Sequence, residues 1–229
     1  RHRRVLGLRA PARMARGGGR VKYYVAAPFG ADRRDEILSN GFGLLYSPTY
    51  RKVPRACEDG QFVLDNGAFS AYVNGSLWDE RAFYSLADQV FERGISPVFV
   101  VLPDIVAGGP ASLDRSVAHI RRLPTEWRKY LPVQDGMTAE HVDPIASQVD
   151  GVFVGGSVGW KWRTAHAWCE FAHGREIACH IGRVNSFRQI LSASRCGADS
   201  ADGSTASRHH ALNKLIRHTT SLQDQGAVA

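Results

Sequence analysis

The stretch Pro97-Val98-Phe99-Val100-Val101-Leu102-Pro103-Asp104 decides the fold. Residues 97–102 form a run rich in β-branched side chains with no polar residue to face water, which is typical of a parallel strand that is buried on both faces. Asp104 follows directly where this strand ends. Because short apolar runs of this kind alternate with amphipathic stretches along the chain, the sequence predicts an α/β fold built on a parallel sheet.

The alternation repeats eight times. The predicted strands cover residues 21–26, 43–47, 61–64, 97–102, 130–133, 151–154, 176–180 and 198–201. The predicted helices cover residues 32–39, 79–93, 111–122, 139–147, 164–173, 186–194 and 205–216. Eight strand–helix repeats predict one compact (β/α)8 TIM-type barrel. A doubly wound open sheet is the alternative, although no Gly-x-Gly-x-x-Gly follows the first strand.

The charge of the chain is concentrated at its start. The 229 residues carry a net charge of +7, but residues 1–20 hold seven arginines and no acid, so the remaining 22 basic and 22 acidic residues balance. We expect residues 1–20 to be a disordered basic tail, 21–216 to be the barrel domain and 217–229 to be a polar C-terminal tail. The first tail is a basic arm for nucleic acid, solvated padding, or the product of a misplaced gene start.

Several classes of protein are disfavoured by composition. No run approaches the roughly 20 apolar residues of a membrane span, and residues 1–20 lack the apolar region of a secretory signal. The four cysteines have no paired close spacing, so neither a disulfide framework nor a zinc site is indicated. We therefore expect a cytoplasmic protein without a metal or other cofactor.

Polar or small residues stand at the ends of the predicted strands. They are Asp65, Asp104, Gln134, Gly155-Gly156 and Asp202. Singly, each has an ordinary explanation, such as an Asp that caps a helix or a Gly pair in a turn. In a barrel, however, these positions share the rim on which active sites are built. His180 and Arg183 also lie near a strand end, where they either contact substrate or form hydrogen bonds inside the rim.

The stretch 196–210 carries the strongest chemical pattern. Asp199 and Asp202 lie three residues apart, and small residues flank Asp202, so a bulky substrate can approach its carboxylate closely. Hydroxyl residues and Arg208 then open a predicted helix, whose N-terminal N–H groups favour an anion. A carboxylate beside a phosphate-binding helix start predicts a nucleotide or sugar substrate. Asp199 is either a partner of Asp202 or a substitute for it.

Together these motifs resemble the guanine transglycosylases that act on nucleic acid, over about residues 21–216. Asp65-Asn66-Gly67-Ala68-Phe69-Ser70 is similar to that family's Asp-Ser-Gly-Gly-Phe/Tyr-Gln motif. The resemblance implies that Asp65 is the general acid/base and that Phe69 stacks on the base. It also implies that Asp202 is the nucleophile, and that Arg208, six residues later, contacts nucleic acid as the family's arginine does.

The resemblance assigns the base-recognition residues as well. It implies that Asp104 binds the Watson–Crick edge of guanine, that Gln134 also contacts the base, and that a backbone amide of Gly155-Gly156 meets the purine carbonyl oxygen. Trp160 and Trp162, which follow the glycine pair, either stack on a neighbouring base or pack a loop.

The departures from the family pattern favour its compact DNA-modifying branch, deoxypurine-in-DNA protein A. The zinc site and the RNA-binding extension of the queuine and archaeosine tRNA-guanine transglycosylases are missing. The implied function is exchange of guanine in DNA for a 7-deazaguanine base of the preQ0 type, through a covalent Asp–sugar intermediate. The partners are then DNA and the two free bases. The alternatives are a tRNA-acting relative, a catalytically silent nucleic-acid-binding homologue, and a hydrolase or glycosidase acting on a small nucleoside.

Overall fold

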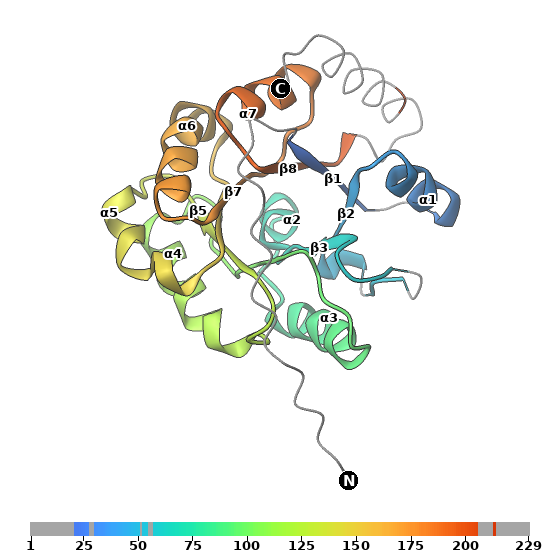
Figure 1. Ribbon diagram of the computed structural model, residues 1–229. Helices are drawn as coiled ribbons and strands as arrows, with labels where there is room; N and C mark the ends of the chain where they lie inside the picture. Colours follow the sequence, from blue (N-terminus) through green and yellow to red (C-terminus); the bar gives the residue numbers. More distant parts are fainter. Residues whose placement is uncertain (1–20, 28–29, 51, 55–56, 206–212, 214–229) are drawn as a thin grey trace.

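The computed structural model describes residues 21–27, 30–50, 52–54, 57–205 and 213, and it confirms the predicted barrel. Eight parallel strands follow one another around a closed ring, in which β1 pairs with both β2 and β8 (Figure 1). The tails 1–20 and 217–229, together with Arg208 and nearly all of the helix predicted over 205–216, lie outside the described residues.

The strands are short, and helices separate most of them. The strands are β1 Lys22–Ala26, β2 Gly43–Tyr46, β3 Phe62–Leu64, β4 Val100–Val101, β5 Lys129–Val133, β6 Gly151–Val154, β7 Ala178–Ile181 and β8 Ser200–Gly203. The α-helices are α1 Ala31–Ser39, α2 Ala68–Val73, α3 Glu80–Glu92, α4 Pro110–His119, α5 Ala139–Val142, α6 Val158–Gly174 and α7 Phe187–Arg195. Three 3-10 turns are η1 Pro48–Tyr50, η2 Ile120–Arg122 and η3 Asp143–Gln148.

Several predicted boundaries are wrong, and three of them bear on the site. β4 has only two residues in regular pairing, although Val98 N–H still donates to Phe62 O and Leu102 N–H to Tyr130 O. Asp202 lies inside β8 rather than after it, because the strand begins two residues later than predicted. α6 begins at Val158 instead of at residue 164, since the Ser157 side chain caps its first turn by accepting from Trp160 N–H.

Side chains fill the barrel. Tyr24, Leu45, Val63, Phe99, Val101 and Tyr130 form an apolar cluster inside the ring of strands. The rings of Phe99 and Tyr130 stack with their centroids 3.8 Å apart. Gly151 makes this packing possible, because a Cβ there would lie 2.8 Å from the Tyr130 ring. A larger apolar layer lies between the strands and the outer helices. Among the described residues, no helix is long and apolar enough to span a membrane.

One helix departs from the outer ring. α2 follows β3 after only three residues, and the chain turns sharply at Gly67, which has a φ of 79°. In the view of Figure 1, α2 overlies the middle of the ring of strands instead of standing outside it with the other helices. The sequence analysis did not predict this helix, because its six residues are too few to show a helical period. The carboxyl end of β3 is therefore adjacent to a short helix that lies against the barrel mouth.

The burial of Leu131 predicts a large contribution to stability. Leu131 lies on β5, is fully buried and belongs to the layer between strands and helices. Leu131→Ala should lower the free energy of unfolding by about 2–5 kcal/mol, because the cavity that it leaves cannot close completely. The matched control is Leu77→Ala, where the side chain is 95% exposed. It should change stability by less than about 0.5 kcal/mol in urea unfolding. Equal stability of the two variants would contradict the packing described here.

Candidate active site at the barrel mouth

The three aspartates that the sequence analysis assigns to the site lie at the carboxyl ends of the strands. Asp65 follows β3, Asp104 follows β4 and Asp202 lies in β8. Their proximity shows in their electrostatics, since desolvation and then the negative charges of Asp202 and Asp104 raise the pKa of Asp65. The closed barrel thus places on one rim two carboxylates that are far apart in the chain.

Asp202 is held by a buried histidine. Asp202 Oδ1 lies 2.9 Å from His180 Nε2, and His180 Nδ1 lies 2.8 Å from Ser200 Oγ. A carboxylate oxygen can only accept, so Nε2 carries the hydrogen of this bond. The His180 ring stacks on Phe153 with centroids 4.7 Å apart and is fully buried. His180 therefore acts inside the rim, and its contacts fix the orientation of the Asp202 carboxylate.

Asp65 has the environment of a proton carrier. Its side chain is half-buried, and Oδ2 accepts a hydrogen bond from Gly67 N–H at 3.0 Å. Desolvation, followed by the charge of Asp202, raises the pKa of Asp65 to about 7. A carboxyl group with a pKa near the working pH can both give and take a proton.

Asp104 is buried between two amide side chains. Asn66 Nδ2 donates to Oδ1 at 2.8 Å, and Gln134 Nε2 donates to Oδ2 at 2.5 Å. Burial raises the pKa of Asp104 to about 6, while the two amide hydrogen bonds oppose that rise. The amides fix the plane of the carboxylate and leave each oxygen a further lone pair. The sequence analysis singled out Gln134 but not Asn66, which the resemblance treats only as a departure from the family's Ser.

The glycine pair after β6 is tied into the same network. Gly156 N–H donates to Gln134 Oε1 at 2.8 Å, and Gly155 N–H donates to Val133 O at 3.0 Å. A Cβ on Gly155 would lie 2.7 Å from Gln134 Nε2, so only glycine allows this approach. Both N–H groups thus have protein partners in this structure, and a purine carbonyl oxygen would have to replace one of them.

Arg183 brings a positive charge to the mouth. Its guanidinium lies 4.2 Å from the centroid of the Phe69 ring and donates to Gly156 O. Its backbone N–H lies 3.4 Å from Asp202 Oδ2, at a strained φ of 56°. The charges of Asp202 and Asp104 act on it directly. Arg183 therefore neutralises part of the acidic cluster and covers one face of the ring that is predicted to stack on a base.

Lys161 supports this region and was not predicted. Although it lies on α6, Lys161 is buried, and its Nζ donates to Gly182 O at 2.6 Å and Arg183 O at 3.3 Å. Burial, with the charge of Arg183, lowers the pKa of Lys161 to about 8. The lysine thereby holds the loop that presents Arg183. In the sequence it lies outside every predicted strand and helix, so no pattern identifies it.

Two alternatives that the sequence left open are now decided. Asp199 precedes β8, so it lies at the opposite end of the strand from the mouth, where it accepts from Cys179 N–H at 2.7 Å. It is therefore not a substitute for Asp202. Trp160 is 9% exposed within the core and Trp162 packs against that core, so both belong to α6 packing rather than to a loop.

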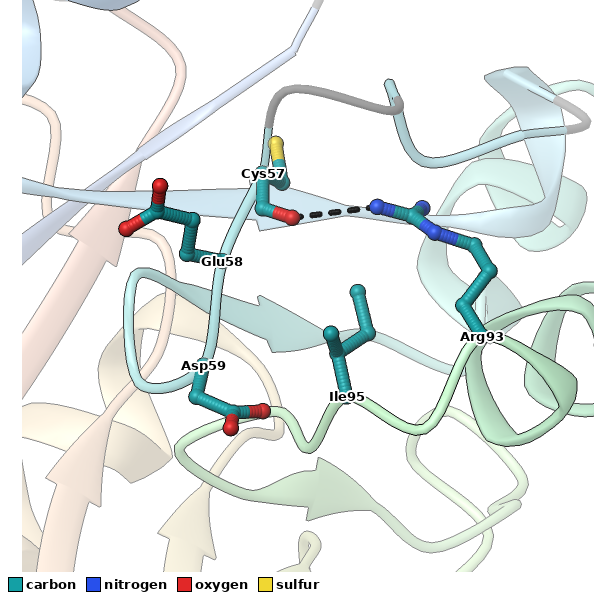
Figure 2. A pocket seen from close by; sticks show the side chains of 5 residues that line it. All are labelled: Cys57, Glu58, Asp59, Arg93 and Ile95. Atoms are coloured by element: carbon teal, nitrogen blue, oxygen red, sulfur yellow. Dashed lines mark hydrogen bonds between the residues drawn. The ribbon is translucent and has the colours of Figure 1, made fainter.

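A surface hollow lies at the opposite end of the barrel from the three acids. Figure 2 shows Cys57, Glu58, Asp59, Arg93 and Ile95 around it, with Arg93 donating to Cys57 O at 3.0 Å. These residues precede β3 and β4, so the hollow lies at the amino ends of the strands, away from the acids. Within the described part of the chain, no group of three His, Cys, Asp or Glu is placed to hold a metal ion.

Comparison with known proteins supports the fold alone. No protein-family model matches the chain, and no curated protein matches it. Among solved structures, it is similar to one described as "QR15, an Aldolase", with a TM-score of 0.53 and 14% identity. The match covers 86% of this chain and 95% of that one. The class of protein that fold and site define is therefore a TIM-type barrel with an acidic mouth.

The raised pKa of Asp65 predicts a pH dependence of stability. The folded protein keeps a proton on Asp65 up to about pH 7, whereas the unfolded chain loses it near 3.8. Stability should therefore fall as pH rises through this window. In Asp65→Asn, which has no proton to lose, urea unfolding should show a smaller decline. The exposed Asp88→Asn on α3 is the control and should keep the wild-type slope; an unchanged slope in Asp65→Asn would contradict the assignment.

Proposed function

We propose that the protein is a guanine transglycosylase that exchanges guanine in DNA for a 7-deazaguanine base of the preQ0 type. The observation that carries the proposal is that Asp202, oriented by His180, lies on the same rim as Asp65, whose pKa is raised to about 7 in part by the charge of Asp202. Cleavage of an N-glycosidic bond with retention needs one carboxylate at the sugar and one carboxyl group that moves a proton. The ordered resemblance of the surrounding motifs adds the choice of guanine.

In the first step, an Asp202 oxygen attacks C1′ of the deoxyribose and forms an ester as the bond to the base nitrogen breaks. The electron pair of that bond stays on the base, and protonated Asp65 gives it a proton. In the second step, Asp65 removes a proton from the incoming base, whose nitrogen attacks C1′ and releases Asp202. Each carboxyl group ends the cycle in its starting state.

Asp104 supplies the selection of the base in this scheme. Its carboxylate, held in plane by Asn66 and Gln134, can accept from the N1–H and the exocyclic amine of guanine. Adenine lacks that pair of donors and would leave the buried carboxylate without them, which costs the wrong substrate binding energy. Phe69 contributes one stacking face, worth about 1–3 kcal/mol for a base.

No specific observation favours a second function. An aldolase that works through a Schiff base needs a lysine amine free to attack a carbonyl. Lys161, the lysine whose pKa responds to the charge of Asp202, is buried with its amine bound to two backbone carbonyls. A tRNA-acting relative would use the same acids, so only the nucleic acid supplied in an assay separates it from the DNA-acting enzyme.

The proposal is tested by incorporation of labelled guanine or preQ0. Wild-type protein should incorporate label into DNA and not into tRNA. Asp202→Asn should lower incorporation by about a thousand-fold or more, because the nucleophile is lost. Asp199→Asn, at the other end of β8, is the matched control and should remain active.

Other outcomes would contradict the proposal in distinct ways. Label in tRNA alone would identify the tRNA-acting relative, and release of free guanine without incorporation would identify a hydrolase. Binding of DNA without either reaction would identify a silent homologue. Full exchange by Asp202→Asn would remove Asp202 from the mechanism.

A further inference from the structure

Exposed apolar side chains gather on the rim that holds the acids. Among the described residues, six large apolar side chains are exposed: Phe69, Tyr72, Val73, Leu77, Phe91 and Val158. Five of them follow the carboxyl end of a strand, and Phe91, near the far end of α3, is the exception. Four belong to α2 and the turn after it, which we call the α2 ridge: Phe69, Tyr72, Val73 and Leu77. The ridge is thus an apolar feature of the mouth rather than scattered surface.

The ridge is exposed and yet firmly held. Leu77 is 95% exposed and Tyr72 is 62% exposed. The turn that presents Leu77 is closed by Ser76 N–H, which donates to Ala71 O at 2.9 Å, and by Gly75 N–H, which donates to Tyr72 O at 3.1 Å. An apolar tip on a hydrogen-bonded turn is suited to insertion into a partner, because little ordering is needed on binding.

Residues at both ends of the ridge contact residues of the candidate active site. Trp78 packs on Phe83 and donates from Nε1 to Asn66 O at 2.8 Å, and the Asn66 side chain holds Asp104. Phe69, the first member, lies under the guanidinium of Arg183. From residue 66 to residue 78 there is no charged side chain. An uncharged segment that carries the apolar side chains of the ridge therefore adjoins the acidic cluster.

Two of the three acids are recessed. Asp202 and Asp104 are buried, with 6% and 5% of their surfaces exposed. A base inside a duplex cannot reach such groups, so the nucleotide must leave the stack before it reacts. Proteins that open a duplex often insert an apolar side chain between bases and so offset the lost stacking.

We propose that the α2 ridge is a wedge that enters duplex DNA beside the target guanine and fills the space that the extruded nucleotide leaves. Leu77 forms its tip, Tyr72 supports it, and Phe69 receives the base at its foot. This inference rests on the proposed function. It adds that the substrate is double-stranded DNA and that its opening is built into the enzyme.

The test compares exchange of labelled guanine in three DNA substrates: a single strand, its perfect duplex and a duplex mismatched at the target. Leu77→Ala and Tyr72→Ala should lower exchange in the perfect duplex by about ten-fold, keep exchange in the single strand, and recover in part on the mismatch. Leu77→Met should keep duplex activity, because it preserves an apolar tip. The matched control Phe91→Ala, equally a truncation of an exposed apolar side chain, should match the wild type throughout.

A second readout does not depend on exchange. With 2-aminopurine beside the target guanine in the duplex, wild-type protein should raise the fluorescence through unstacking, and Leu77→Ala should not. Equal loss on single strand and duplex, or unchanged duplex exchange, would overturn the wedge. A wild-type dimer that Leu77→Ala turns into a monomer would instead assign the ridge to contact between two copies. If the wild type exchanges guanine in no DNA, the proposed function fails, and the fluorescence result still decides whether the ridge opens a duplex.

Discussion

Closure of the sheet between β1 and β8 is the constraint on which the site depends. In that closure Tyr24 stands opposite Asp202, while the neighbouring pairings run from Tyr24 to Gly43 and from Tyr46 to Leu64. Backbone hydrogen bonds therefore connect the strand that holds Asp202 to the strand that ends at Asp65 through only two intervening strands. Two acids from opposite ends of the domain thereby share one rim, and the charge of one raises the pKa of the other.

Three carboxylates in one cluster repel one another and lose hydration. The surrounding residues reduce this electrostatic cost in different ways. His180 holds Asp202 by a hydrogen bond, Asn66 and Gln134 hold Asp104, and Arg183 lies close to both. Asp65 accepts from Gly67 N–H, and desolvation and like charge raise its pKa to about 7, whereas the pKa of Asp104 rises to about 6. The same arrangement that makes the cluster tolerable leaves one member ready to exchange a proton near neutral pH.

The sequence predicted much of this, and its limits have physical reasons. Apolar runs that end at Asp65, Asp104 and Gln134 predicted the barrel and the rim on which these residues stand, because parallel strands buried on both faces lack the usual alternation. The contact of Arg183 with Phe69 was not predictable, since it depends on a left-handed residue at the end of β7. Lys161 was missed because it precedes the helix predicted over 164–173, and α2 was missed because its six residues are too few to show a period.

The central claim is that Asp202 bonds covalently to the sugar during turnover. The most direct measurement is mass spectrometry of protein denatured in the middle of a reaction with guanine-containing DNA, followed by mapping of the modified peptide. The account predicts a DNA adduct on the peptide that contains Asp202, formed by the wild type and absent from Asp202→Ala. An adduct on Asp65 or Asp199, or rapid exchange with no adduct at all, would contradict it.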